Sequence, residues 1–259
     1  IVVQRVFDKF GNFIIPPYSQ FFNDVEYNQV KIFKADFSYP SKGNYTDPSS
    51  QFDSATRDSN ASKSGDQPVF YVISSGSQGP APNSVGEPGA AKNVLTVGSI
   101  GNPRKGTQNQ VMSWSARGPA LDGRIKPDVV AIGDTVYGLK GRLQAPPPYQ
   151  NLSGGVSSSG LAAGAAALLA NYYAITGVSD PSPALLKASL INCAEDVPDG
   201  TPIPNNNEGW GKIRLKNIIY PSVPVIFADQ NVTLVTSQSK VFYVKPKTAG
   251  APFKITLVW

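Results

Sequence analysis

The chain comprises 259 residues, of which 41% are hydrophobic and 16% charged, a balance that excludes a disordered or coiled-coil protein and predicts a globular one. Its formal net charge is +5, but the Lys and Arg residues are scattered and form no run of the kind that binds nucleic acid. Cys193 is the only cysteine and histidine is absent, which excludes an internal disulfide and effectively excludes a zinc site.

Five short apolar runs, rich in β-branched residues and bounded by turn residues, predict strands. The runs are continuously apolar, without alternation, and this is typical of strands buried on both faces of a parallel sheet. They cover residues 1–6, 30–34, 69–74, 94–98 and 127–131. Residues 38–68, rich in Ser, Asn, Asp, Gly and Thr, predict one long surface loop.

Two later stretches predict helices. Residues 160–173 are rich in Ala and Gly, and such small residues let a neighbouring backbone approach closely. In the second stretch, residues 180–191, Ser182 can cap a helix whose first position is Pro183. Strands that alternate with helices of this length predict a doubly wound parallel sheet.

The character of the chain changes near Pro221. Val, Thr, Ser and Phe alternate through residues 232–244, and residues 253–259 predict a further strand. We therefore predict two domains, an α/β domain over residues 1–220 and the beginning of an antiparallel β domain over residues 221–259.

Sequons and the chain's opening residues bear on its location. The chain begins with Ile and has neither a signal peptide nor an apolar run near 20 residues, which predicts a processed or partial chain without a membrane span. Its partners would then be other proteins or other segments of a longer polypeptide. Four Asn-x-Ser/Thr sequons favour a secreted glycoprotein, at Asn44, Asn60, Asn151 and Asn231.

Four sequence blocks carry a family resemblance. Residues 70–80 read Phe-Tyr-Val-Ile-Ser-Ser-Gly-Ser-Gln-Gly-Pro, and residues 86–98 contain Gly-Glu-Pro-Gly and end in Val-Gly. Residues 113–129 contain Ala-Arg-Gly-Pro, Asp-Gly-Arg and Lys-Pro-Asp, and residues 154–168 read Gly-Gly-Val-Ser-Ser-Ser-Gly before an Ala-rich run. In this order the blocks resemble the subtilisin-like serine peptidases, or subtilases.

The subgroup that the chain resembles most is the alkaline bacterial subtilases with a C-terminal β-sandwich, through residues 207–212 and 254–259. The resemblance implies the C-terminal half of a subtilisin-like doubly wound parallel sheet, followed by the start of that sandwich. By its register, the family's catalytic Asp and His segments would precede Ile1.

The resemblance leaves the nucleophile position open. If Gly154 and Gly155 are aligned on the family's Gly-Gly-Thr-Ser turn, Ser157 stands at the nucleophile. If the following helix is aligned without a gap, Val156 stands there, and we prefer this register because deleting one residue would rotate the helix by about 100°. A purely structural alternative is that residues 157–159 only cap the helix. In either register the base that activates a serine cannot come from this chain, since the chain lacks histidine.

The other site positions have also changed relative to the family. The oxyanion-hole Asn falls on Ser77, whose shorter side chain would need a water to reach the oxyanion. Ser38 replaces a glycine of the substrate-binding segment, and we expect it to narrow the groove. The groove positions implied by the resemblance are Asp36, Phe37, Ser38, Ser75 and Gly76.

These observations favour a catalytically degenerate subtilase module that serves as a structural or binding component of a secreted protein or extracellular assembly. The rival is an active subtilisin-like endopeptidase whose Asp and His lie upstream, with Ser157 as nucleophile. A third reading assigns adhesion or carbohydrate binding to the β domain. No cofactor is required, and no compact set of acidic residues indicates a metal site, although calcium is common in the family.

Overall fold

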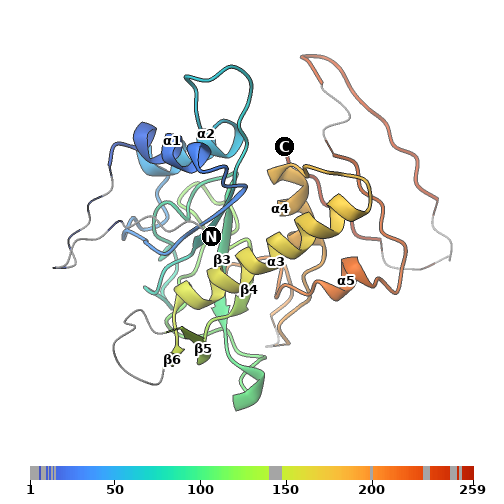
Figure 1. Ribbon diagram of the computed structural model, residues 1–259. Helices are drawn as coiled ribbons and strands as arrows, with labels where there is room; N and C mark the ends of the chain where they lie inside the picture. The colour runs from blue at the N-terminus through green and yellow to red at the C-terminus, as the bar shows by residue number, and fades with distance from the viewer. Residues whose placement is uncertain are drawn as a thin grey trace.

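The computed structural model describes residues 6, 10, 12, 14, 16–139, 148–198, 201–229, 234–245, 250 and 253–259. Its centre is a four-stranded parallel sheet in the order β1-β2-β3-β4 (Figure 1). The strands are β1 (Ile32–Ala35), β2 (Phe70–Ser74), β3 (Leu95–Ile100) and β4 (Val129–Ile132). They coincide with four of the five predicted runs. The fifth, residues 1–6, lies outside the described residues except for Val6.

Helices cover both faces of this sheet, so the fold is the predicted α/β arrangement (Figure 1). One face carries α3 (Gly155–Ile175) and α4 (Pro183–Asn192), and the other carries α1 (Tyr18–Tyr27) and α2 (Asp47–Arg57). The remaining elements are η1 (Pro103–Lys105), the antiparallel hairpin β5 (Val136–Leu139) and β6 (Tyr149–Leu152), and α5 (Lys216–Ile219).

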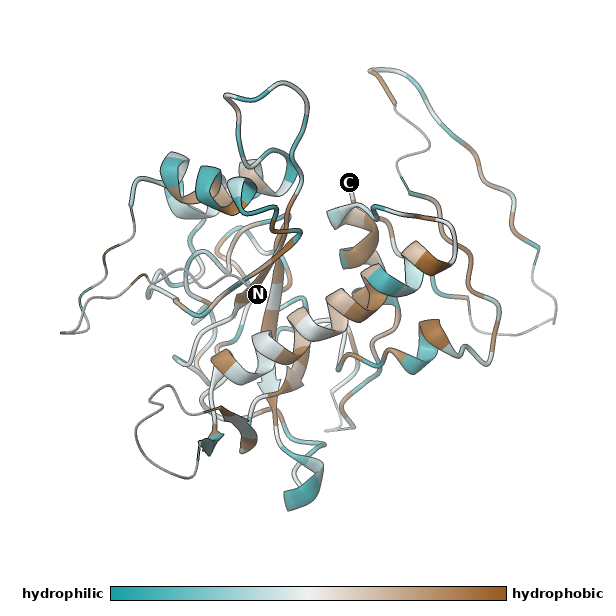
Figure 2. Cartoon of the chain, in the orientation of Figure 1, coloured by the Kyte–Doolittle hydropathy of each residue, from teal (hydrophilic) through white to brown (hydrophobic). Residues whose placement is uncertain are grey.

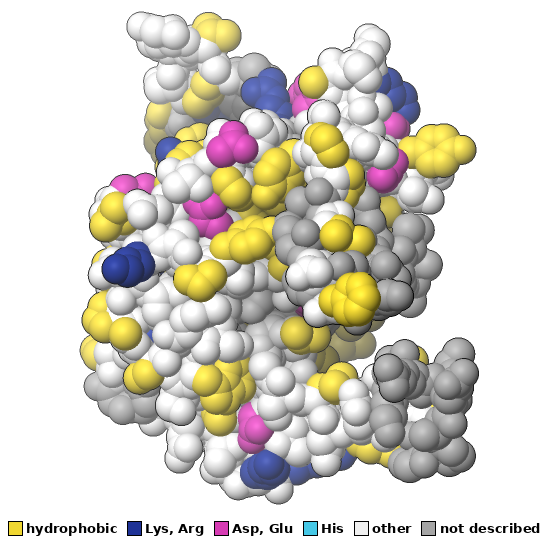
Figure 3. Space-filling view, turned by 90° about the vertical axis from the view of Figure 1, so that its left-hand side faces the viewer, with side chains coloured by type: hydrophobic (Ala, Val, Ile, Leu, Met, Phe, Trp, Pro, Cys, Tyr) yellow, Lys and Arg dark blue, Asp and Glu magenta, His cyan; other side chains and the backbone are white. Residues whose placement is uncertain are grey.

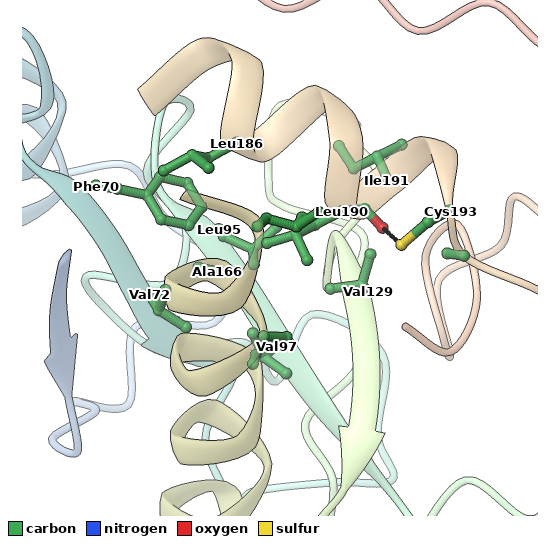
Figure 4. Packing of buried hydrophobic residues seen from close by; sticks show 14 of the residues in the cluster. Phe70, Val72, Leu95, Val97, Val129, Ala166, Leu186, Leu190, Ile191 and Cys193 are labelled. Atoms are coloured by element: carbon green, nitrogen blue, oxygen red, sulfur yellow. Dashed lines mark hydrogen bonds between the residues drawn. The ribbon is translucent and has the colours of Figure 1, made fainter. Parts of the chain in front are cut away.

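Alternation along β2 divides the core into two clusters. Phe70 and Val72 belong to the cluster beneath α3 and α4, whereas Tyr71 and Ile73 belong to the cluster beneath α1 and α2. All five residues of β2 are buried, because helices pack on both faces. Figure 4 shows the first cluster, in which side chains of β2, β3 and β4 meet Ala166 of α3 and the apolar residues of α4.

The two predicted helices are present. Ser182 caps α4 through its Oγ, which accepts a hydrogen bond from the Leu185 backbone N–H at 3.0 Å, and Pro183 is the first helical residue. The helix predicted over residues 160–173 is longer than expected, because α3 begins at Gly155. Its cap residue is Gly154, with φ +133° and no side-chain capping bond, so the prediction that residues 157–159 cap it is wrong.

The prediction of one long loop over residues 38–68 is also wrong, since α2 lies within it. The helix buries Phe52 completely and is closed at its amino end by a carboxylate from elsewhere in the sequence. Glu87 accepts hydrogen bonds from the backbone N–H and the hydroxyl of Thr46, both at 2.6 Å, and from the Ser49 hydroxyl at 3.4 Å. A negative charge at a helix N-terminus is stabilising.

A buried ionic cluster joins the sheet to α4. The Asp128 carboxylate lies 3.0 Å from Lys126 Nζ and 3.6 Å from Lys187 Nζ, and accepts a hydrogen bond from the Thr96 backbone N–H at 2.7 Å. Burial lowers the pKa of Lys126 to about 8, although the Asp128 charge opposes this shift. Burial alone would raise the pKa of Asp128, but the two ammonium groups outweigh it and hold that pKa below its ordinary value.

The described residues beyond Tyr220 form neither helix nor strand, but they contact α4 at both ends. At its amino end the Ser182 backbone N–H donates to Asp229 at 2.9 Å. At its carboxyl end Lys254 Nζ donates to the carbonyl oxygens of Ile191 and Ala194, at 3.1 and 3.2 Å. The domain boundary at residue 220 and the β-sandwich stay predictions.

Candidate active site

The candidate site lies where β2 ends and α3 begins. After Ser74 the chain turns through Gly76, whose φ is +103° and whose backbone N–H donates to Ser74 Oγ at 3.1 Å. At the facing helix entry, a Cβ on Gly155 would collide with Ser74 Oγ. Residue 155 must therefore be glycine for α3 to approach β2 this closely.

The first turn of α3 presents Val156 to solvent and hides the hydroxyl of Ser157. Val156 is 45% exposed, whereas Ser157 is 7% exposed. Ser157 Oγ is buried and has no hydrogen-bond partner among the described residues. Successive helical residues point about 100° apart, so both side chains cannot face the same surface. The side chain that faces outward at the helix entry is an isopropyl group.

The next two serines also turn inward. The hydroxyl of Ser158 lies 2.9 Å from that of Ser99 on β3 and donates to the Gly155 carbonyl at 3.1 Å. Ser159 donates to the same carbonyl at 2.7 Å, and its hydroxyl lies 3.5 Å from the Asp36 carboxylate. These hydroxyls bond to groups inside the protein and are not available at the surface of α3.

The predicted groove positions lie on the segments that follow β1 and β2. Asp36, directly after β1, is exposed and forms an ion pair with Lys34, whereas Phe37 is buried. Ser77, the residue that we predict at the oxyanion-hole position, is exposed. The hydroxyl of Ser75 is buried without a partner among the described residues.

Ser38 occupies the space between two glycines. Its buried hydroxyl would lie 2.9 Å from a Cβ on Gly76 and would collide with a Cβ on Gly86. The neighbouring Tyr39 exchanges backbone hydrogen bonds with Glu87, both at 2.9 Å, which holds the two segments together. The narrowing of the groove that we expect from Ser38 stays a prediction, and the close approach of Ser38 to Gly86 had no signal in the sequence.

Other candidate positions fall elsewhere. Asn44 and Asn151 are exposed, Asn60 is half-buried with its amide donating to Glu26 at 3.3 Å, and Asn231 lies outside the described residues.

No three Asp, Glu or Cys side chains of the described residues gather as a metal site would require. None of the helices in the described part of the chain combines the length and the hydrophobicity that a membrane span needs. Figure 3 shows Lys and Arg as separate spots on one face of the molecule.

A cavity of about 220 Å³ lies at the opposite end of the sheet from the candidate site. It opens at the amino ends of β1 and β2, beside the ion pair between Lys31 and Asp180 at 2.9 Å. The candidate site is assigned by its residues and its position at the carboxyl ends of the strands, where ligands bind in open parallel sheets.

Comparison with known proteins decides the family. The sequence profile described as the Subtilase family matches residues 22–211. The chain belongs to the subtilase family. This subtilase is 28% identical over 163 residues to the serine protease AprX of Bacillus subtilis, a match covering 58% of this chain and 35% of AprX. It is 26% identical over 219 residues to tripeptidyl-peptidase 2 of Caenorhabditis elegans, covering 73% of this chain and 15% of that protein.

Solved structures place the subtilase chain in the same fold. A lanthipeptide protease superposes with a TM-score of 0.61 at 20% identity, covering 83% of this chain and 68% of that one. The prenylagaramide maturation protease PagA superposes with a TM-score of 0.58 at 19% identity, covering 78% and 65%. The subtilase chain therefore spans about two thirds of these solved chains and about a third or less of the two curated relatives.

Proposed function

We propose that this chain is a catalytically degenerate subtilase module, a structural or binding component of a secreted protein or extracellular assembly. The observation that carries the proposal is the pair Val156 and Ser157 at the entry of α3. The exposed position bears a hydrocarbon side chain, and the neighbouring hydroxyl is buried without a partner among the described residues.

The chemistry of acyl transfer supports this reading. A serine attacks a peptide carbonyl only when a base removes its proton, and the family's base is a histidine that this sequence lacks. The oxyanion position holds Ser77, and losing one oxyanion donor typically lowers the rate by about a hundred to a thousandfold. Each change alone would impair catalysis, and together they leave little of the mechanism.

The rival function is an active endopeptidase in which an upstream segment supplies Asp and His and Ser157 is the nucleophile. The names of AprX and of tripeptidyl-peptidase 2 as peptidases favour it. In this rival, Ser157 Oγ would have to leave its buried position and reach the groove beside Ser38 and Gly76. That movement requires rotation or partial unwinding of the first turn of α3.

Labelling with a fluorophosphonate separates the two functions. The native protein and AprX are treated in parallel, and the tryptic peptide of residues 143–187 is analysed by mass spectrometry. We expect an adduct on AprX and none on this peptide. An adduct that disappears in Ser157→Ala but persists in the matched control Ser158→Ala would overturn the proposal and establish the rival.

Secretion has its own test. Asn44 and Asn151 are exposed, as glycosylation requires. We expect material from the native source to lose mass at one or both residues after enzymatic deglycosylation. The Asn44→Gln variant should lose less mass than the wild type, and the difference should equal the glycan at residue 44. Unmodified Asn44 and Asn151 in that material would remove this support for an extracellular location.

A further inference from the structure

The hairpin of β5 and β6 has one exposed face. Its strands pair in antiparallel register, with Tyr137 opposite Asn151 and Leu139 opposite Tyr149. Directly paired residues of an antiparallel ladder point to the same side, and so do residues two apart along a strand. These four residues therefore share one face of the hairpin, and all of them are exposed. Figure 2 shows hydrophobic and hydrophilic segments side by side on this hairpin, which is labelled in Figure 1.

The opposite face and the base of the hairpin fix its register. A Cβ on Gly138 would lie 2.9 Å from the Cδ1 atom of Leu152, so the leucine side chain fills the space beside the glycine. At the base, Ser153 Oγ accepts a hydrogen bond from the Thr135 backbone N–H at 2.8 Å and donates one to the Asp134 carboxylate at 3.1 Å. A slip of one residue would break this packing and turn every side chain to the other face. The register therefore determines which side chains meet solvent.

Two tyrosine rings form an aromatic platform on the exposed face. The rings of Tyr137 and Tyr149 are stacked, with their centroids 5.4 Å apart and their planes inclined by 24°. Tyr137 is 62% exposed and Tyr149 is 45% exposed, so the stacked pair leaves much ring surface open. Leu139 enlarges the apolar area, because it is exposed beside Tyr149. Apolar side chains that gather on a surface, in place of standing singly, mark a site of interaction.

The acceptor of a sequon stands beside this platform. Asn151, Leu152 and Ser153 form an Asn-x-Ser triplet, and Asn151 is exposed. Its partner across the ladder is Tyr137, and paired Cβ atoms of an antiparallel ladder lie about 4.5–5.5 Å apart. Tyr149 precedes Asn151 by two residues on the same strand and shares its face. A sugar on the amide nitrogen of Asn151 would therefore begin next to both rings.

We propose that the aromatic platform of Tyr137 and Tyr149 binds the first N-acetylglucosamine of a glycan on Asn151 by noncovalent packing. The proposal rests on the extracellular location proposed above. The faces of an aromatic ring are negative, and the axial C–H groups of a pyranose ring are slightly positive, so the two rings pack face to face. The hydroxyl of each tyrosine lies at the ring edge, where it can bond to sugar hydroxyls. The sugar and its platform thus belong to one hairpin.

The test combines removal of the sugar with removal of one ring. The chain is secreted from a eukaryotic host as the variant Asn44→Gln, Asn60→Gln and Asn231→Gln, so that Asn151 is the acceptor that remains. An endoglycosidase that leaves the first N-acetylglucosamine gives the sugar-bearing form, Asn151→Gln gives the bare form, and mass spectrometry verifies both. We expect the sugar to raise the Tm by about 2–4 °C with Tyr137 present, and by less than about 1 °C in Tyr137→Ala.

A matched control removes a tyrosine from another part of the surface. Tyr27 is 84% exposed on α1, which lies at the other end of the view from β5 and β6 (Figure 1). Tyr27→Ala should keep the full effect of the sugar on the Tm. Nuclear Overhauser contacts between the sugar protons and the Tyr137 ring give a second readout, which a change of stability alone would not produce.

Equal effects of the sugar in the wild-type hairpin and in Tyr137→Ala, without such contacts, would overturn the proposal. An Asn151 that stays unmodified in the secreted chain would overturn it as well. The host supplies the secretion in this experiment, so neither outcome depends on where the native protein resides. The extracellular location is decided separately, by the mass of Asn44 and Asn151 peptides in material from the native source.

Discussion

Glu87 closes the amino end of α2 from 41 residues away, since both of its carboxylate oxygens accept hydrogen bonds from Thr46 at 2.6 Å. Glu87→Ala should lower the free energy of unfolding by about 1–3 kcal/mol, because it removes the acceptor of the Thr46 bonds and leaves the buried Ser49 hydroxyl without this partner. Urea denaturation measures the change. The control is Asp66→Asn, whose ion pair with Arg57 is exposed and should contribute less than about 0.5 kcal/mol. Equal effects of the two substitutions would contradict the capping role.

Two neighbouring serines should respond oppositely to the loss of a hydroxyl. Ser157→Ala removes a buried group without a partner among the described residues and should raise the free energy of unfolding by about 1 kcal/mol. Ser158→Ala breaks the 2.9 Å bond to Ser99 and should lower it by about 1 kcal/mol. Chemical denaturation of the two variants decides. Destabilisation by Ser157→Ala would mean that its hydroxyl is hydrogen-bonded in the native protein.

Substitution by alanine should change the stability in opposite directions at two glycines of α3. Gly155→Ala places a methyl group against Ser74 Oγ and should cost about 1–3 kcal/mol of stability. Gly164→Ala enters open space and should stabilise this chain by about 0.5–1 kcal/mol. Adding Ser74→Ala to Gly155→Ala should restore part of the loss, a coupling that a double-mutant cycle measures. Strict additivity would show that Ser74 is not the obstacle.

Cys193 should resist modification in the folded protein. Burial raises the pKa of its thiol from 9.0 to about 11, and the thiol donates to the Leu190 carbonyl at 3.3 Å (Figure 4). An aromatic disulfide reagent at pH 8 should react with it fully in urea and hardly at all without urea. Rapid reaction of the native thiol would contradict this burial.

The same thiol has a pH signature. Between pH 9 and 11 the unfolded chain releases the thiol proton while the folded chain keeps it, so the folded state loses stability as the pH rises. The stability of the wild type relative to Cys193→Ala should be constant below pH 9 and fall above it by up to about 1.4 kcal/mol per pH unit. A difference that does not change across this window would show that the thiol ionises equally in both states.

The sheet could be predicted because its signal is local. Each strand is a continuous apolar run, and α4 begins at an adjacent Ser-Pro pair, Ser182 and Pro183. The helix α2 could not be predicted in this way. The carboxylate that closes its amino end belongs to Glu87, which is distant in the sequence, and only a few of its side chains reach the core. For the candidate site, the sequence predicted which positions belong to it but not the directions in which their side chains point. The direction in which Ser157 points depends on where α3 begins, and this is fixed by the contact of Gly155 with Ser74.

The contacts at the two ends of α4 bear on how the chain can be divided. Asp229 binds one end of the helix and Lys254 the other, so a single stretch of tail holds both termini of an element that belongs to the α/β core. Cutting the chain at residue 220 would release both ends at once, whereas Lys187 in the middle of the helix would keep its contacts with Asp128 and Val94. We expect that α4 frays at both ends when residues 1–220 are expressed alone, because the contacts from Asp229 and Lys254 are then missing.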